Sequence, residues 1–357
     1  MNKKIILSFL IFILISLLMI LSGCYALEIE DYSIVAGIGI DYNNQEFEIT
    51  FEIYEENNGQ TTNLSSTTKS SKGNTISESF NKISSFMNKK PYLNHASVII
   101  INEDLAKNKF NETINYLLHD VRLRSACYFI ISKNQTSKEI FEKSKELKKV
   151  IAFDIYKHFD IKEGLIQKWS KTKFNEVINE KINENGTIIL PTITYKNECD
   201  INGAYLIKSD NEQIMVNDYE VFAFQIFNNQ ITEGLFNVRN LESYYIKKIT
   251  NKLKYKNDKI LLKINLKILS YEQINIENKE QYTDLLTKEL MYYIEEVYYK
   301  YVLMDFDPFR IYNLLHNYYP NVYNDNKNNY YSFLKSKDLN VDINIDLLSL
   351  GLSEERI

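Results

Sequence analysis

Leu21-Ser22-Gly23-Cys24 is the segment of the chain whose residue types predict a specific chemical modification. It matches the bacterial lipobox, in which the cysteine thiol takes a diacylglycerol and the chain is cut in front of that cysteine. Lysines precede it at positions 3 and 4, and an apolar run interrupted only by two serines fills positions 5–21. A positive start, an apolar core and small residues before a cut site make a signal peptide. We therefore predict a lipoprotein signal peptide over residues 1–23 and an N-palmitoyl, S-diacylglycerol cysteine at Cys24.

A membrane-spanning anchor is the alternative interpretation of the same segment. An apolar run over positions 5–21, at about 1.5 Å rise per residue, would nearly span a bilayer. The lipobox favours the lipoprotein instead. A diacylglycerol plus an N-acyl group supplies two or three hydrocarbon chains, which hold a protein firmly where one chain does so only marginally. The rest of the chain has no second long apolar segment, so we expect the body to project from the outer face of the membrane.

The other reactive side chains show no spacing that predicts catalysis. No P-loop, GxSxG or HExxH sequence occurs, and Gly37-Ile38-Gly39 is only a fragment of a dinucleotide fingerprint. Its glycines favour close packing or a β-bulge. Asp305 and Asp307 could form an acid/base pair, but an aspartate before a helix is ordinarily its cap, and we expect a cap. The scattered histidines, expected to be structural or surface residues, are His95, His119, His158 and His316.

Two cysteines remain after lipidation, Cys127 and Cys199, and they are far apart and lack CxxC spacing. We expect buried thiols rather than a disulfide. We accordingly expect no catalytic residue, no metal site and no cofactor.

The charge of the chain is mildly acidic. Removal of residues 1–23 takes away two lysines and no acid, so the formal net charge changes from −5 to −7. Nothing in this balance indicates nucleic acid or anionic lipid as a partner. The remaining length predicts two or three domains.

The first part of the chain alternates between strand and helix patterns. Residues 33–54 predict a β-hairpin, in which positions 47–53 alternate apolar and polar side chains. The polar stretch 57–74 predicts a flexible loop. Helices are expected at 76–87, 103–118 and 136–147, the last with a capping box of Thr136 and Glu139. Strands are expected at 96–101 and 126–131, and we place the N-terminal α/β domain at residues 24–199.

The second part, residues 200–357, predicts another α/β domain. Strand patterns occur at 203–207, 219–227, 260–268 and 341–347. A long tyrosine-rich helix is expected at 279–304, with its tyrosines in the core, at an interface or both, and a shorter helix at 308–318. The long alternating strands indicate antiparallel pairing. The fold class predicted is α+β: several small domains with largely antiparallel sheets flanked by helices, including a C-terminal sheet with a long helix.

Four stretches follow one another in an order and spacing typical of one family. The first is Cys24 with Glu28-Ile29 and the strand that ends in Gly37-Ile38-Gly39-Ile40-Asp41. The second runs from His95-Ala96-Ser97 through Glu103-Asp104-Leu105-Ala106 to Asp120-Val121-Arg122-Leu123-Arg124. The third joins 188–191 to Ile201-Asn202-Gly203-Ala204-Tyr205. The fourth comprises the long helix, 305–309, Tyr319-Pro320, 341–345 and Gly351-Leu352.

With these stretches the chain resembles the Ger(x)C lipoproteins, the C subunits of nutrient germinant receptors of spore-forming bacteria. Three stretches depart from the family pattern. The usual Trp-Asp-Arg-Arg after the lipid cysteine is Tyr25-Ala26-Leu27 here, and the usual Gly-Phe after the aspartate near position 305 is replaced by Asp307-Pro308-Phe309. Tyrosines such as Tyr323 and Tyr330 stand in the region after Tyr-Pro where the family has tryptophans.

The resemblance implies a receptor subunit rather than an enzyme. Such a subunit works with a multi-pass membrane A subunit and a transporter-like B subunit, to which nutrient binding is generally assigned. The complex sits in the inner membrane of the dormant spore and triggers germination when nutrients arrive. The family has a mixed α/β ectodomain of several small domains and no catalytic residues to carry over.

Two other functions remain open. A substrate-binding lipoprotein of a transporter has a similar length, but it usually has two parallel α/β lobes, and the antiparallel pattern counts against it. A lipid-anchored hydrolase would need a nucleophile with a neighbouring base, and the sequence offers no such constellation.

Overall fold

The computed structural model describes residues 31–349, except 56–64, 121, 161–169, 184, 232, 238–242 and 271–278, together with 7–9, 11–13 and 16. Cys24, the predicted cut site and most of the predicted signal peptide therefore lie outside the described residues. Within the described part, no helix is both long enough and apolar enough to cross a membrane.

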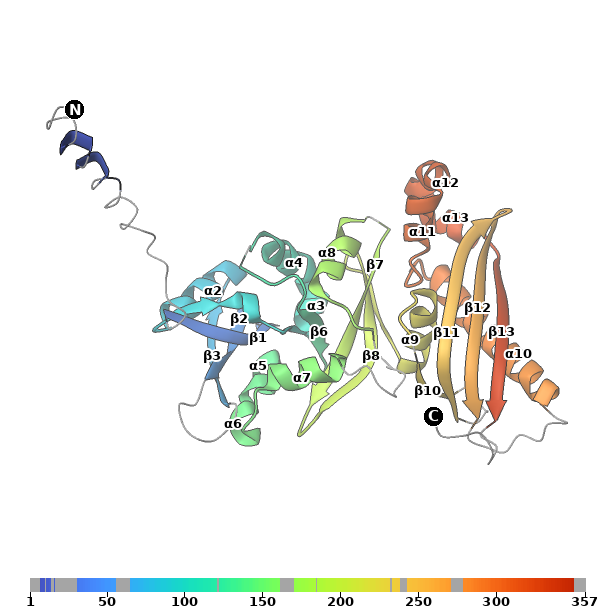
Figure 1. Ribbon diagram of the computed structural model, residues 1–357, viewed down its shortest axis with the longest axis horizontal. Coiled ribbons are helices and arrows are strands. Elements are labelled where there is room, and N and C mark those ends of the chain that lie inside the picture. The colour runs from blue at the N-terminus through green and yellow to red at the C-terminus, as the bar shows by residue number, and fades with distance from the viewer. Residues whose placement is uncertain are drawn as a thin grey trace.

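A large sheet of mixed orientation organises the first part of the chain (Figure 1). Its strand order is β3-β2-β1-β5-β6-β7-β8-β9, with β4 paired to β1. The neighbouring strands β1, β5, β6 and β7 run parallel, and the outer pairs are antiparallel. The strands are β1 (Tyr32–Asn43), β2 (Glu46–Glu55), β3 (Ser65–Gly73), β4 (Lys90–Tyr92), β5 (Val98–Asn102), β6 (Tyr128–Ser132), β7 (Thr187–Tyr195), β8 (Cys199–Lys208) and β9 (Gln213–Val216).

Helices cover both faces of this sheet. Along β5, Ile99 and Ile101 belong to the core under one set of helices, and Val98 and Ile100 to the core under the other. The first set is α2 (Ile76–Ser85), α3 (Glu103–Asn108), α4 (Phe110–His119) and α8 (Phe174–Ile182). The second set is α5 (Ser137–Glu142), α6 (Ser144–Leu147) and α7 (Ile151–Asp160).

The second part of the chain is a smaller sheet covered by helices on one face, and a single core fills the space between them. The strand order is β10 (Gly234–Asn237), β11 (Ser243–Lys256), β12 (Lys259–Ser270) and β13 (Leu339–Ser349). The helices are α9 (Asp218–Phe227), α10 (Lys279–Leu303), α11 (Ile311–Tyr318), α12 (Pro320–Asn326) and α13 (Tyr330–Lys335). In Figure 1 α9 lies between the two sheets.

The predicted class of α+β sheets flanked by helices is confirmed, including the C-terminal sheet with its long helix. The capping box is present as predicted, because Thr136 accepts from the Glu139 backbone and Glu139 accepts from the Thr136 backbone. The helix expected at 103–118 is divided at Lys109 into α3 and α4.

Three local predictions were wrong. Residues 219–227 form α9 rather than a strand; this helix is buried all round, so its apolar run has no period that separates helix from strand. Residues 65–73, expected to be loop, form β3, a polar strand at the edge of the sheet. The last strand pairs with β12 in parallel, not antiparallel, because α10 carries the chain back along the sheet before β13 begins.

The domain boundary near residue 200 stays a prediction. The first sheet continues across it through β8 and β9. Side chains of that region, such as Ala204 and Leu206, belong to the core of the second part. The two parts therefore share the β7–β9 region.

Gly37 and Gly39 allow helices to lie directly on β1, and the strand is also bulged between Val35 and Gly37. A Cβ at Gly37 would lie 2.8 Å from the Ala152 Cβ of α7, and one at Gly39 would lie 2.8 Å from the Ser137 Cβ of α5. Real Cβ atoms do not approach so closely. Close packing or a bulge was predicted for this segment, and both are present.

Two buried carboxylates fasten the same helices. Asp41, at the end of the glycine motif, accepts hydrogen bonds from the Ser137 backbone (2.8 Å), the Ser137 hydroxyl (2.8 Å) and the Lys138 backbone (3.1 Å). Glu52 of β2 accepts from the backbones of Ile151 and Ala152, both at 2.7 Å, and from the Ser66 hydroxyl at 2.7 Å. Each carboxylate therefore caps the first turn of a helix from a neighbouring strand.

Burial sets the ionisation of both groups. It raises the pKa of Asp41 to about 6 and that of Glu52 to about 7, although their hydrogen bonds pull in the opposite direction. Position 52 was expected on the polar face of an alternating strand. The side chain is instead fully buried, because α7 covers that face.

We predict that Gly39→Ala destabilises the protein by about 1–3 kcal/mol, the usual cost of forcing extra atoms into a packed core. Urea unfolding followed by circular dichroism measures this. The clash involves Ser137, so Ser137→Ala should cost less in the Gly39→Ala background than alone. If the losses of stability caused by the two substitutions simply add, the contact between residues 39 and 137 is not the cause of the destabilisation.

We predict that stability falls as pH rises between about 4.5 and 7. A carboxyl whose folded pKa is raised binds more protons in the folded state than in the unfolded state, so its contribution is fully present at low pH and is lost as pH rises through the folded pKa. For Glu52 the loss is on the order of 3 kcal/mol. Denaturation of Glu52→Gln at pH 5 and pH 7 should show a smaller difference than wild type. The exposed control Glu46→Gln should keep the wild-type difference.

Candidate functional site

The carboxyl ends of the parallel strands β1, β5 and β6 meet at one edge of the first sheet, the place where α/β proteins commonly bind ligands. Asn102, the last residue of β5, lies there. Its side-chain oxygen accepts from the Tyr42 backbone (3.1 Å) and the Leu105 backbone (3.0 Å), and its amide donates to Tyr42 O and to Asn43 Oδ1. Asn102 thus joins β1 to β5 and caps α3.

Glu103 and Gln135 connect the same edge to β7 and β8. The Glu103 carboxylate accepts from the Asn134 backbone (2.9 Å) and from the Tyr205 hydroxyl (2.8 Å). The Gln135 amide exchanges two hydrogen bonds with the Tyr195 backbone, at 3.0 and 2.8 Å. These polar groups hold the loops of the edge in place.

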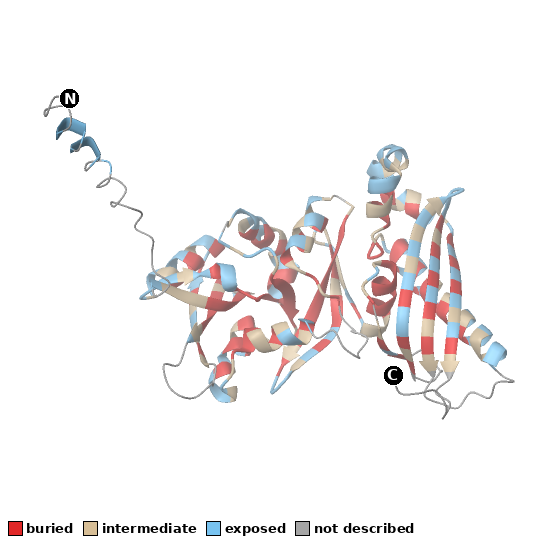
Figure 2. Cartoon of the chain, viewed as in Figure 1, coloured by how far each residue is buried: buried red, intermediate tan, exposed pale blue. Residues whose placement is uncertain are grey.

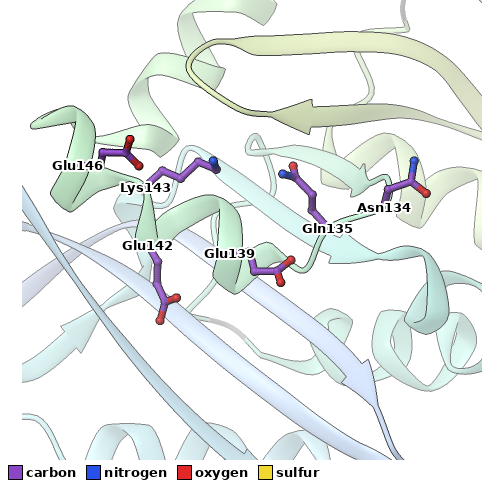
Figure 3. Close-up of a pocket in the computed structure, with 6 residues that line it drawn as sticks. All are labelled: Asn134, Gln135, Glu139, Glu142, Lys143 and Glu146. Carbon is purple, nitrogen blue, oxygen red and sulfur yellow. The ribbon is translucent and has the colours of Figure 1, made fainter.

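Two hollows open at this edge. The larger, about 520 Å³, is lined by Asn134, Gln135, Glu139, Glu142, Lys143 and Glu146, and in Figure 3 Glu142 points away from Asn134 and Gln135. The smaller, about 220 Å³, shares Asn134, Gln135 and Glu139 with it. In the described chain, no group of three histidine, cysteine or carboxylate side chains could hold a metal ion. The hollows offer acidic walls rather than a converging set of ligands.

Ionisable groups are also concentrated where α8 meets the second part of the chain. Arg310 lies 3.1 Å from Glu176 and 3.1 Å from Glu180. Burial raises the pKa of Glu180 to about 7, although the Arg310 charge opposes the shift. Asn183 of the same segment donates to the Tyr312 hydroxyl. This junction consists of paired charges and hydrogen bonds that hold the two parts together.

Asp307 is the centre of the junction, and it is a cap as predicted rather than half of an acid/base pair. Its carboxylate accepts from the Ile311 backbone (3.1 Å), the Tyr312 backbone (2.9 Å) and the Tyr330 hydroxyl (2.6 Å). Burial raises its pKa above the usual range. Asp305 instead forms an ion pair with Lys335 at 2.7 Å.

A hollow of about 350 Å³ lies beside this junction, with Lys208, Asp210, Asp305 and Lys335 among its walls. Both lysines are already paired, Lys335 with Asp305 and Lys208 with Glu212. The Lys208 ammonium also lies over the Phe306 ring, 5.0 Å from its centroid. The two lysines of this hollow therefore interact with other side chains of the protein itself.

Cys127 and Cys199 are free thiols, as predicted; Cys127 is buried as expected, whereas Cys199 is only partly buried. Burial raises the pKa of each to about 12, which keeps them protonated and poorly nucleophilic. Two of the histidines bond locally: His119 Nδ1 lies 2.7 Å from Asn115 O, and His316 Nδ1 lies 3.2 Å from Asn317 Oδ1.

The tyrosines of α10 divide between core and surface. Tyr293, Tyr298 and Tyr301 are buried in the core of the second part. Tyr292 is 68% exposed and Tyr299 39% exposed. The helix therefore packs on its own sheet with one face and presents tyrosine to solvent with another.

Sequence reasoning missed the structural roles of Asp41 and Glu52. Asp41 stood out only as the last residue of a glycine motif, and Glu52 as one of several alternating acids. The predicted site residue Cys24 lies outside the described residues, so its modification stays a prediction.

Two family models match the chain. Residues 26–195 match the spore germination protein N-terminal domain, and residues 202–351 match the spore germination B3/GerAC-like C-terminal domain. The search of curated proteins gave no match.

A solved structure titled "Crystal Structure of the GerBC protein" has a similar fold, with a TM-score of 0.54 at 15% identity. The match covers 87% of this chain and 97% of that one. At this identity the similarity concerns the fold, and the family models carry the assignment. Because those models together span the two parts of the chain, the protein belongs to the Ger(x)C family of spore germination proteins, the C subunits of germinant receptors.

Proposed function

We propose that this protein is the lipid-anchored C subunit of a spore nutrient germinant receptor, which acts without catalysis beside membrane-embedded A and B subunits. The observation that carries the proposal is the pair of family models over residues 26–195 and 202–351, directly behind a lipobox that ends at Cys24. Lipid on Cys24 would hold the folded body on the outer face of the spore inner membrane.

The described side chains support a structural rather than a chemical role. The buried carboxylates Asp41, Glu52 and Asp307 each accept backbone N–H groups at the start of a helix. Arg310 is held between two glutamates of α8. Such groups give a rigid body that could brace the outer surfaces of its partners.

A shared membrane would raise the effective concentration of the subunits for one another. An anchored subunit and a membrane-embedded partner diffuse on one surface, so they meet more often without any additional contact. The anchor would therefore matter most when the direct contacts between subunits are weak.

We predict that Cys24→Ala abolishes lipidation and lowers nutrient-triggered germination, since the thiol that takes the diacylglycerol is lost. Incorporation of labelled palmitate measures the first effect, and the fall in optical density of a spore suspension after nutrient addition measures the second. Cys199→Ala is the matched control, because it removes a thiol outside the lipobox; it should keep both signals. Full germination by spores carrying unlipidated protein at normal abundance would overturn the anchoring role.

A thermal-shift screen separates this role from that of a substrate-binding lipoprotein. A receptor subunit whose partner binds the nutrient should show no shift in melting temperature with amino acids, sugars or nucleosides. A shift of several degrees with one nutrient would indicate direct binding, and the proposed division of labour between the subunits would be wrong.

A further inference from the structure

The outer face of the C-terminal sheet, opposite its helices, carries a regular array of lysines. Side chains alternate along β11 and β12, so Ile249, Leu262 and Ile264 enter the core. The residues between them point outward, and Figure 2 shows the alternation as bands of buried and exposed residues along the strands. Most of the outward positions are lysine or a short polar residue.

The strand register arranges these lysines in rows across the sheet. In each row a lysine of β11 stands directly opposite a lysine of β12. On its other side, each of these β12 lysines forms an ion pair with an aspartate. Asp346 and Asp342 of β13 lie 3.9 and 3.0 Å from their lysines, and Asp338, just before β13, lies 3.3 Å from its lysine. The three lysine rows are Lys248–Lys267–Asp346, Lys252–Lys263–Asp342 and Lys256–Lys259–Asp338.

Among the described residues, no acidic side chain balances the positive charge along β11. The aspartates neutralise the lysines of β12, whereas Lys248, Lys252 and Lys256 form no ion pair with any described residue. Lys247 and Lys254 of the same strand are also exposed. Successive rows lie about 14 Å apart along the strands, and neighbouring strands are about 4.8 Å apart. Like charges placed directly opposite each other destabilise a sheet.

Protection of a sheet edge explains only part of this pattern. β10 pairs with β11 as far as Ile246, so the rest of β11 lies at the edge of the described sheet, where lysines discourage association with other strands. That role does not require lysines on β12, which is paired on both sides. Ion pairs with the aspartates account for the lysines of β12, but placing lysine rather than another polar residue opposite each of them on β11 is unfavourable for the sheet and needs another reason.

We propose that the lysine rows bind the anionic headgroups of a phospholipid surface. The lysines lie on an open sheet face, and none of the three hollows described above includes them. Long lysine stems with point charges suit a plane of phosphates, and each lysine near an anionic surface strengthens partition onto it by about fivefold. In the rows, six lysines stand beside three aspartates, so this face is positive although the net charge of the chain is acidic.

The proposal rests on the proposed membrane anchor, which supplies the surface. From Cys24 to the start of β1 at Tyr32 the chain can reach at most about 28 Å. An anchor so close to the folded body keeps that body beside the headgroups. The lysine rows would then fix which face of the body turns toward the membrane.

Vesicle binding tests the lysine rows without the lipid anchor or the receptor partners. The purified chain from Tyr25 to Ile357 contains every residue of the three cores. It should float with vesicles of phosphatidylglycerol and phosphatidylcholine in equal parts, should not float with phosphatidylcholine alone, and should dissociate when salt is raised. The triple variant K248Q/K252Q/K256Q should bind the anionic vesicles roughly a hundredfold more weakly.

Two controls make the test specific. K89Q/K107Q/K157Q removes the same charge from exposed lysines of the first part and should bind as wild type does; an equal loss would show that net charge alone is responsible. K248R/K252R/K256R keeps the charge and should retain binding, while circular dichroism checks that each variant is folded. Unchanged binding by the triple glutamine variant overturns the proposal. Tighter binding of wild type to polyglutamate than to anionic vesicles also overturns it, in favour of an acidic protein partner.

The outcome is independent of the anchoring experiment. Cys24→Ala measures whether lipid is attached and whether germination depends on it. The vesicle experiment measures a chain that carries no lipid. If Cys24→Ala changed neither lipidation nor germination but the unlipidated chain still bound anionic vesicles through its lysines, the anchoring role would be wrong. The lysine rows would still be a lipid-binding face.

Discussion

Buried carboxylates that accept the N–H groups at the start of helices are the interaction on which the arrangement of this molecule depends. A carboxylate in a protein interior is costly unless several donors surround it. The first turn of a helix supplies such donors together with its dipole. Asp41 and Glu52 use them to hold α5 and α7 against one face of the first sheet, and Asp307 uses them to hold α11 at the junction of the two parts.

The glycines of β1 make this arrangement possible. A side chain at Gly37 or Gly39 would displace α7 or α5 from the sheet, and the carboxylates would then no longer reach the helix starts. The glycine motif, part of one of the four stretches by which the sequence resembles the family, is thus explained by packing and capping between β1, β2 and their helices. Its aspartate fastens a helix, and no ligand is needed to explain the residue.

Patterns that depend on neighbours in sequence were predictable, and patterns that depend on neighbours in space were not. The capping box at Thr136, the period-two strand at 260–268 and the cap formed by Asp307 all followed from local residue types. The helix at 219–227 did not, because its burial on all sides removes the helical period. Glu52 was equally hidden, since alternation shows that a strand has two faces but not that a helix covers the second one.

The lysine rows belong to the same class of hidden feature, and they also have an unfavourable energy in the isolated protein. Each of the three β12 lysines stands between a like charge on β11 and an opposite charge, which lies on β13 for two of them and on Asp338, just before β13, for the third. Glutamate or threonine on β11 would protect the sheet edge without that repulsion. Natural proteins depart from the most stable arrangement mainly where function requires it. An anionic surface against this face would turn three repulsive contacts into favourable ones, which is why we assign the rows to binding rather than to folding.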